Sequence, residues 1–149
     1  FLEGIAAGRF LQVPAYAFHG GVAPSGSRKV VGRYLFAKPG LEDGPAVQEA
    51  VSEDAEVREA FDRALGILFA AWEAGSFFPR LFDEKTRSEP EPCQTCSVSQ
   101  ACLRGDSGAR LALVHWLERS ARRRRGGAGA LHPAEEALYD TWKIAEGEG

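Results

Sequence analysis

The chain has 149 residues, of which 44% are hydrophobic and 26% are charged, the proportions of an ordinary globular protein. Its net charge of -3 argues against a protein that is basic throughout, although a local basic patch can still bind nucleic acid. No apolar run reaches the ~20 residues that a membrane-spanning helix needs, and no secretion signal is visible, so we expect no membrane partner.

The first third of the chain predicts short elements separated by turns. The apolar segment 11–18 fits a short helix or a strand, and the glycine-rich residues after it predict a loop at 22–27. Segment 29–37 is rich in β-branched and aromatic residues and predicts a strand. Residues 42–52 are polar and mixed, and they predict a loop with at most one helical turn.

The clearest predicted element is a helix over residues 54–74. Its apolar residues recur at helical spacing and form one stripe, which is typical of a helix packed against a core. The stripe consists of Val57, Phe61, Leu65, Leu68, Phe69 and Trp72. Gly75 follows the last turn and predicts its C-terminal cap.

The remainder predicts a connector, a cysteine-containing loop and two helices. The connector is segment 77–92, with three prolines and apolar anchors at Phe77, Phe78, Leu81 and Phe82. A helix is predicted over 109–125, with Leu111, Val114, Leu117 and Ala121 on one side. A glycine-rich hinge at 126–130 leads to a last helix over 133–144, whose apolar contacts are Leu138, Tyr139 and Trp142.

The three cysteines lie within ten residues, in the pattern C-x2-C-x5-C formed by Cys93, Cys96 and Cys102. This odd, tight cluster indicates metal or cluster ligation in a reducing compartment, so we expect a cytoplasmic protein. Thiolates suit zinc and iron–sulfur clusters, which each take four ligands. Three interpretations are open: a [4Fe–4S] cluster with a fourth cysteine upstream of Phe1, a Cys3His zinc site completed by His115, or three free or buried thiols.

A second short motif is Q-x3-Y, formed by Gln12 and Tyr16. If this segment is helical, the two residues are i and i+4 and share one face. The amide and the phenol could then point together into a cleft, although such a pair on its own is a weak signal.

The two motifs gain meaning in combination. A Leu-Gln-x-Pro-x-Tyr-Ala segment, a strand, a long helix and C-x2-C-x5-C resemble the C-terminal half of PD-(D/E)XK exonuclease domains. The pattern is most similar to the RecB-type nuclease modules of AddB-type helicase–nuclease subunits and of CRISPR-associated exonucleases. The resemblance implies an α/β, restriction-endonuclease-like fold over residues 1–103, rich in helices and ending in an iron–sulfur tail. Residues 104–149 would then be a helical appendage.

The resemblance also implies roles for individual residues. Gln12 and Tyr16 would line the active site and position DNA. Cys93, Cys96 and Cys102 would be three of the four ligands of a [4Fe–4S] cluster that staples the domain. The whole protein would be an exonuclease that uses Mg²⁺ or Mn²⁺ and acts in double-strand break repair or recombination, in some members beside a helicase subunit or domain.

One departure from the family pattern limits what the chain can do alone. The catalytic Asp and the Glu-x-Lys signature precede Q-x3-Y in the family, but only eleven residues precede Gln12 and Glu3 is their only acid. The chain also contains no methionine, so we expect Phe1 to follow an upstream part that carries these residues. Because the class needs acids to hold its divalent cations, we expect the chain alone to be inactive.

A basic run ends the predicted helix 109–125, and it consists of Arg119 and four consecutive arginines, Arg122, Arg123, Arg124 and Arg125. Two interpretations carry equal weight: a solvated helix end that the helix dipole favours, or contacts to DNA phosphates. The rival for the whole chain is a small zinc-binding interaction module, held by the three cysteines and His115, without catalytic activity.

Overall fold

The computed structural model describes residues 1–19, 29–35, 47–76, 80–83, 88–126 and 129–145. Over these residues the chain is rich in helices and has a two-stranded antiparallel sheet, which is compatible with an α/β class. The chain divides into two compact units, Phe1–Gly66 and Ile67–Glu148. None of the described helices is both long enough and apolar enough to cross a membrane.

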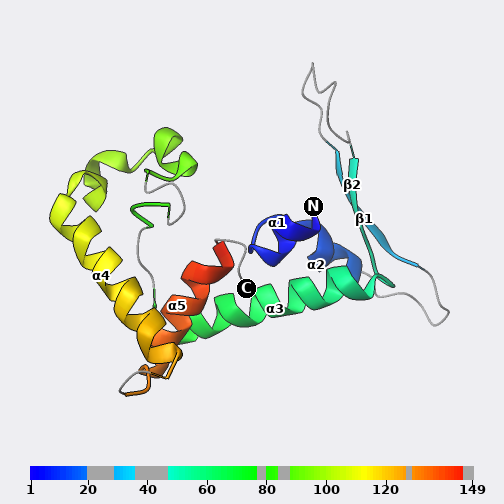
Figure 1. Cartoon of the computed structure of the whole chain (residues 1–149). Helices are drawn as coiled ribbons and strands as arrows, with labels where there is room; N and C mark the ends of the chain where they lie inside the picture. Colours follow the sequence, from blue (N-terminus) through cyan, green and yellow to red (C-terminus); the bar gives the residue numbers. More distant parts are fainter. Residues whose placement is uncertain (20–28, 36–46, 77–79, 84–87, 127–128, 146–149) are drawn as a thin grey trace. The chain divides into compact units, whose positions relative to one another are not determined.

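The first unit contains two short helices, a β-hairpin and the start of a long helix (Figure 1). These are α1 (Leu2–Ala6), α2 (Gln12–His19), β1 (Val31–Leu35), β2 (Val47–Val51) and α3 (Ala55–Glu73). Segment 11–18, for which both a helix and a strand were predicted, is therefore helical. The expected loop at 22–27 lies outside the described residues.

The two strands pair antiparallel, from Val31 opposite Val51 to Leu35 opposite Val47. The strand predicted over 29–37 is confirmed in its centre. The loop predicted over 42–52 is wrong where β2 runs, and residues 42–46 lie outside the described part. Gln, Glu and Ala, which fill the middle of β2, are poor strand formers, and long-range pairing with β1 overrides this local preference.

Helix α2 packs closely on the hairpin through a glycine. A Cβ atom on Gly32 would lie 2.6 Å from the carbonyl oxygen of Val13, so only glycine permits this approach. Ala50, on the paired strand, is fully buried. The buried core of the unit joins α1, α2, β2 and α3, and it consists of Ile5, Val13, Ala17, Ala50, Val57, Ala60 and Phe61.

Helix α3 confirms the predicted helix over 54–74. The Oδ1 atom of Asp54 accepts hydrogen bonds from the backbone N–H groups of Glu56 and Val57, which caps the first turn. Gly75 follows the helix with a positive φ of 64°, as a C-terminal cap requires.

The apolar stripe of α3 is buried only in part. Val57 and Phe61 are buried, but Phe69 is 61% exposed and Trp72 is 70% exposed. The prediction of one continuous core stripe is therefore wrong at its C-terminal end. Phe69 and Trp72 lie beyond Gly66 in the second unit, whose core is built from other side chains.

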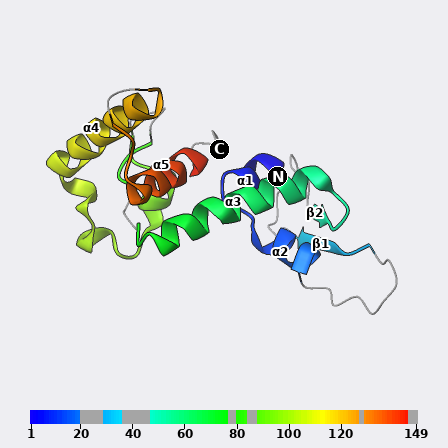
Figure 2. The ribbon, with the colours of Figure 1, turned by 90° about the horizontal axis from the view of Figure 1, so that it is seen from below.

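Among its described residues, the second unit contains the end of α3, three short 3₁₀ turns and two further helices. These are α4 (Ser107–Arg124) and α5 (Pro133–Ala145), which lie side by side (Figure 2). Both predicted C-terminal helices are thus confirmed. Asp106 caps α4, because its Oδ1 accepts the N–H of Ala109 at 3.0 Å. Glu135 closes the first turn of α5 by accepting the N–H of His132 at 3.2 Å.

The core of the second unit is aromatic. Phe82, Leu117, Tyr139 and Trp142 form it, with the rings of Phe82 and Trp142 5.1 Å apart. Leu81 and Phe82 are buried, as expected of anchors of the connector, whereas Phe77 and Phe78 lie outside the described residues. Leu111 is 56% exposed, so the apolar side predicted for α4 is buried only around Leu117.

Candidate cysteine loop, Gln–Tyr pair and arginine groove

The Gln–Tyr pair is formed on one exposed face of α2. The Nε2 atom of Gln12 donates a hydrogen bond to the hydroxyl of Tyr16 at 3.0 Å, as the i, i+4 spacing predicts. Val13, Pro14 and Ala17 bury the opposite face. Core packing therefore fixes the rotation of α2 and turns both polar groups outward, and 59% of Tyr16 is exposed.

The pair offers hydrogen-bonding groups and an aromatic face but no charge. An amide and a phenol can contact a phosphate oxygen or a base, and the phenol ring can stack on a base. Neither group can hold a divalent cation as carboxylates do. The pair is therefore suited to positioning a ligand and not to activating water.

The three cysteines lie in a loop of successive 3₁₀ turns. Cys93 lies in η1 (Glu91–Thr95), Cys96 follows that turn directly, and Cys102 lies between η2 (Ser99–Ala101) and η3 (Leu103–Gly105). All three are free thiols and half-buried. The loop therefore offers three thiols that no disulfide consumes.

Arg104 ties the two ends of this loop together. Its Nη1 donates to the backbone oxygen of Cys93 at 3.0 Å, and its Nε lies 2.7 Å from Oε1 of Glu89. Nη2 contacts the second carboxylate oxygen of Glu89 at 3.2 Å, so the ion pair is bidentate. This clasp holds the backbone of the first cysteine before any metal is bound.

Burial raises the pKa of the Cys93 thiol, and the nearby charges of Glu89, Cys102 and Cys96 raise it further, while Arg104 opposes the shift. The other two thiols thus lie close enough to Cys93 to act on its ionisation. The Sγ atom of Cys93 lies 3.9 Å from the carbonyl oxygen of Arg80, a weak hydrogen bond that also favours the protonated thiol.

The three free thiols of this loop are the type of ligand that zinc and iron–sulfur clusters take. Among the described residues, however, no group of three or more His, Cys, Asp or Glu side chains is arranged to hold a metal ion. His115 is exposed on α4. A [4Fe–4S] cluster or a Cys3His zinc site would require the loop to draw its sulfurs together.

The arginine run divides into two pairs with different surroundings. Arg123 contacts Glu135 at 3.4 Å, and Arg124 forms ion pairs with Glu136 and Asp140. The guanidinium of Arg124 also lies 5.3 Å from the ring centroid of Tyr139. These two arginines therefore hold α5 against α4, a role that neither predicted interpretation included.

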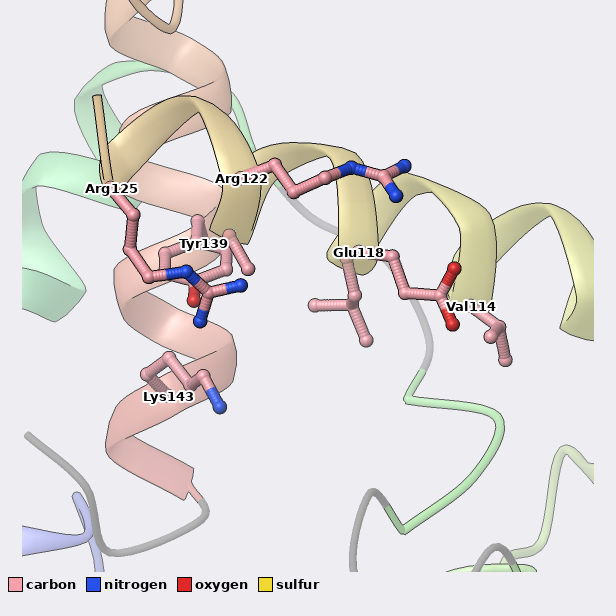
Figure 3. A pocket seen from close by; sticks show the side chains of 8 residues that line it. Val114, Glu118, Arg122, Arg125, Tyr139 and Lys143 are labelled. Atoms are coloured by element: carbon pink, nitrogen blue, oxygen red, sulfur yellow. The ribbon is translucent and has the colours of Figure 1, made fainter. Parts of the chain in front are cut away.

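The other two arginines, Arg122 and Arg125, line a groove between α4 and α5 of about 360 Å³ (Figure 3). Glu118 lines it from α4, and Tyr139 and Lys143 line it from α5. We call this the arginine groove. Two of the four predicted DNA-binding arginines therefore line the same groove as Lys143.

The sequence did not identify Glu89, Arg104 or Lys143 as site residues. Opposite charges flanking the cysteine motif were a usable signal for Glu89 and Arg104. Lys143 could be identified only once the packing of α4 against α5 was known.

Comparisons with models of protein families, with curated proteins and with solved structures found no match for this chain.

Proposed function

We propose that this chain is the C-terminal portion of an iron–sulfur PD-(D/E)XK exonuclease that degrades DNA in the cytoplasm. The carrying observation is the loop of three free, half-buried cysteines with C-x2-C-x5-C spacing, held by Arg104. In the proposal, Cys93, Cys96 and Cys102 supply three ligands of a [4Fe–4S] cluster. A cysteine elsewhere in the protein supplies the fourth.

The formed Gln–Tyr pair supports the same proposal. The resemblance requires Gln12 and Tyr16 to act together beside DNA, and they share an exposed face of α2 and are hydrogen-bonded. Their part would be to hold the DNA backbone and a base near the scissile bond. The metal-binding acids and the lysine would come from the nuclease core outside these 149 residues, and a helicase subunit or domain can act beside it.

The proposed cluster has a structural role and not a redox role. A [4Fe–4S] centre would cross-link the cysteine loop to the part of the protein that carries the fourth ligand, and so stabilise the fold. The residues of this chain position DNA, and Mg²⁺ or Mn²⁺ bound to the core would supply the hydrolytic chemistry.

The test is anaerobic reconstitution of the chain with iron and sulfide in the presence of an excess of a small thiol. The small thiol can fill the fourth coordination position. We expect a brown protein with broad absorption near ~400 nm and matched iron and sulfide contents, because thiolate-to-iron charge transfer absorbs there. Replacing any one of the three cysteines by Ser should lower the iron content strongly, and Ser99→Ala in the same loop should not.

The alternatives give different results in the same experiment. A colourless protein that binds one zinc ion, and loses it in His115→Ala, would replace the proposal with a Cys3His interaction module. A chain that takes up neither iron nor zinc when the small thiol is present would overturn both. Without the nuclease core, we expect no cleavage of DNA by this chain in Mg²⁺ or Mn²⁺.

A further inference from the structure

The arginine groove brings cationic side chains together from two helices. Arg122 lies on α4, Arg125 caps its C-terminal end and Lys143 lies on α5, and among the described residues that line the groove Glu118 is the acidic one. Figure 3 shows Arg125 and Lys143 extending into the same space, with Arg122 and Glu118 farther along α4. Among its described lining residues the groove has three cations and one acid, although the whole chain carries a net charge of -3.

The two arginines of the groove differ from their neighbours in the run. Arg123 and Arg124 pair with acids on α5, whereas Arg122 and Arg125 form no ion pair within the part of the chain that the structure describes. Arginines at the end of α4 can offset the helix dipole, but the dipole does not explain why they share a groove with a lysine of α5. The arrangement is suited to an anion.

We propose that the arginine groove binds the phosphate groups of a nucleic-acid strand. Arg122 in the last turn of α4 and Arg125 at its C-cap are i and i+3, so their Cβ atoms are roughly 5–6 Å apart and their guanidinium groups can reach neighbouring phosphates. The planar guanidinium fork matches phosphate oxygens, and Lys143 adds a point charge from the other wall. The hydroxyl of Tyr139, which also lines the groove, can donate to the same oxygens.

Recognition of this kind is independent of base sequence, because the groove offers charge and no base-reading surface. The choice of a nucleic acid as the anion rests on the proposed function, whereas the anion-binding character rests on the groove alone. The site would hold a strand at α4 and α5, separately from the Gln–Tyr pair of the first unit.

The experiment is fluorescence anisotropy with a labelled single-stranded DNA, titrated at several salt concentrations with the whole chain. Arg122→Ala/Arg125→Ala is compared with Arg9→Ala/Lys29→Ala, which removes the same charge at exposed positions outside the groove. Each phosphate contact on a single strand contributes about 0.7 to the slope of log K against log salt. We therefore expect the groove variant to bind more weakly and to lose about 1.4 of that slope, and the control pair to stay close to the wild type.

Equal affinities and slopes for the two variants would overturn the proposal. A groove variant that no longer binds tripolyphosphate but keeps its affinity for DNA would also overturn it, because the ligand would then be a small phosphorylated molecule. Circular dichroism of each variant checks that α4 and α5 remain folded. The reconstitution test separates the two proposals: a chain that takes up no iron with the small thiol present, but whose groove variant still loses DNA binding, refutes the cluster and keeps the groove.

Discussion

Cys93 differs from a solvent-exposed thiol in both its surroundings and its ionisation. Burial and the charge of Glu89 raise the pKa of Cys93 above its ordinary value of 9.0. The folded chain thus holds this proton more tightly than the unfolded chain does. The resulting stabilisation is fully present below pH 9.0 and is lost as the pH rises through the higher folded-state value.

This shift predicts slow alkylation of Cys93 in the metal-free chain. At pH 8 to 9 a smaller fraction of Cys93 is thiolate in the folded chain than in urea, so iodoacetamide should modify it more slowly when folded. Peptide mass spectrometry after timed quenching measures the rate at this residue. The ratio of unfolded to folded rates should decrease once the pH exceeds the raised value.

Glu89→Gln is the matched variant for this measurement. Glutamine keeps an oxygen that can accept from Arg104 but removes the negative charge that raises the pKa of Cys93. We expect Cys93 to react faster in this variant at pH 8. An unchanged rate would show that burial alone protects the thiol.

At this scale, the sequence predicted the residues that carry recognisable chemistry. The spacing of Cys93, Cys96 and Cys102 and the helical spacing of Gln12 and Tyr16 are local properties, visible without a fold. The division of the arginine run is not local, because it depends on which acids of α5 face α4.

Among the elements, the packing of α2 on β1 depends on the missing side chain at Gly32. A Cβ atom there would meet the backbone oxygen of Val13 at 2.6 Å and its Cγ1 at 2.8 Å. The backbone oxygen cannot rotate away, so the helix would have to shift off the strand. This contact fixes the position of the helix that carries the Gln–Tyr pair.

Gly32→Ala should therefore destabilise the first unit by roughly 1–3 kcal/mol, the usual range for overpacking. Gly66→Ala is the control, since a Cβ there meets nothing within 4 Å and alanine is the better helix former in α3. Urea unfolding followed by circular dichroism measures both. The idea fails if the two alanine variants have the same stability.

Elements defined by a strong local pattern were predictable, and those defined by pairing were not. The helices α3, α4 and α5 have caps and apolar periodicity within their own sequences. Strand β2 has neither, because Val-Gln-Glu-Ala-Val becomes a strand through its ladder with β1. The exposure of Phe69 and Trp72 could not be predicted from the apolar stripe of α3, because burial depends on which other elements pack against the helix.

In the whole molecule, the boundary between the two compact units falls within α3 and not in a linker. A helix forms cooperatively, so loss of one unit removes packing from a helix that the other unit also uses. We therefore expect the two units to unfold together. All three tryptophans, Trp72, Trp116 and Trp142, belong to the second unit, so their fluorescence reports that unit alone.

Gly66→Pro should separate the two transitions, because proline in a helix interior costs about 3 kcal/mol and breaks the backbone ladder. In the wild type, circular dichroism and tryptophan fluorescence should give one common melting curve. In Gly66→Pro the fluorescence transition should depart from the circular dichroism transition. Separate curves already in the wild type would contradict coupling through α3.

The continuity of α3 also bears on how this protein can be inherited. A break between Gly66 and Ile67 would leave as many as four backbone N–H groups and four carbonyl groups without their helical partners. Recombination at this point would thus join half of α3 to the sequence of an unrelated protein. We expect selection to remove such fusions. Homologous proteins should therefore contain both compact units together, and not one of them alone.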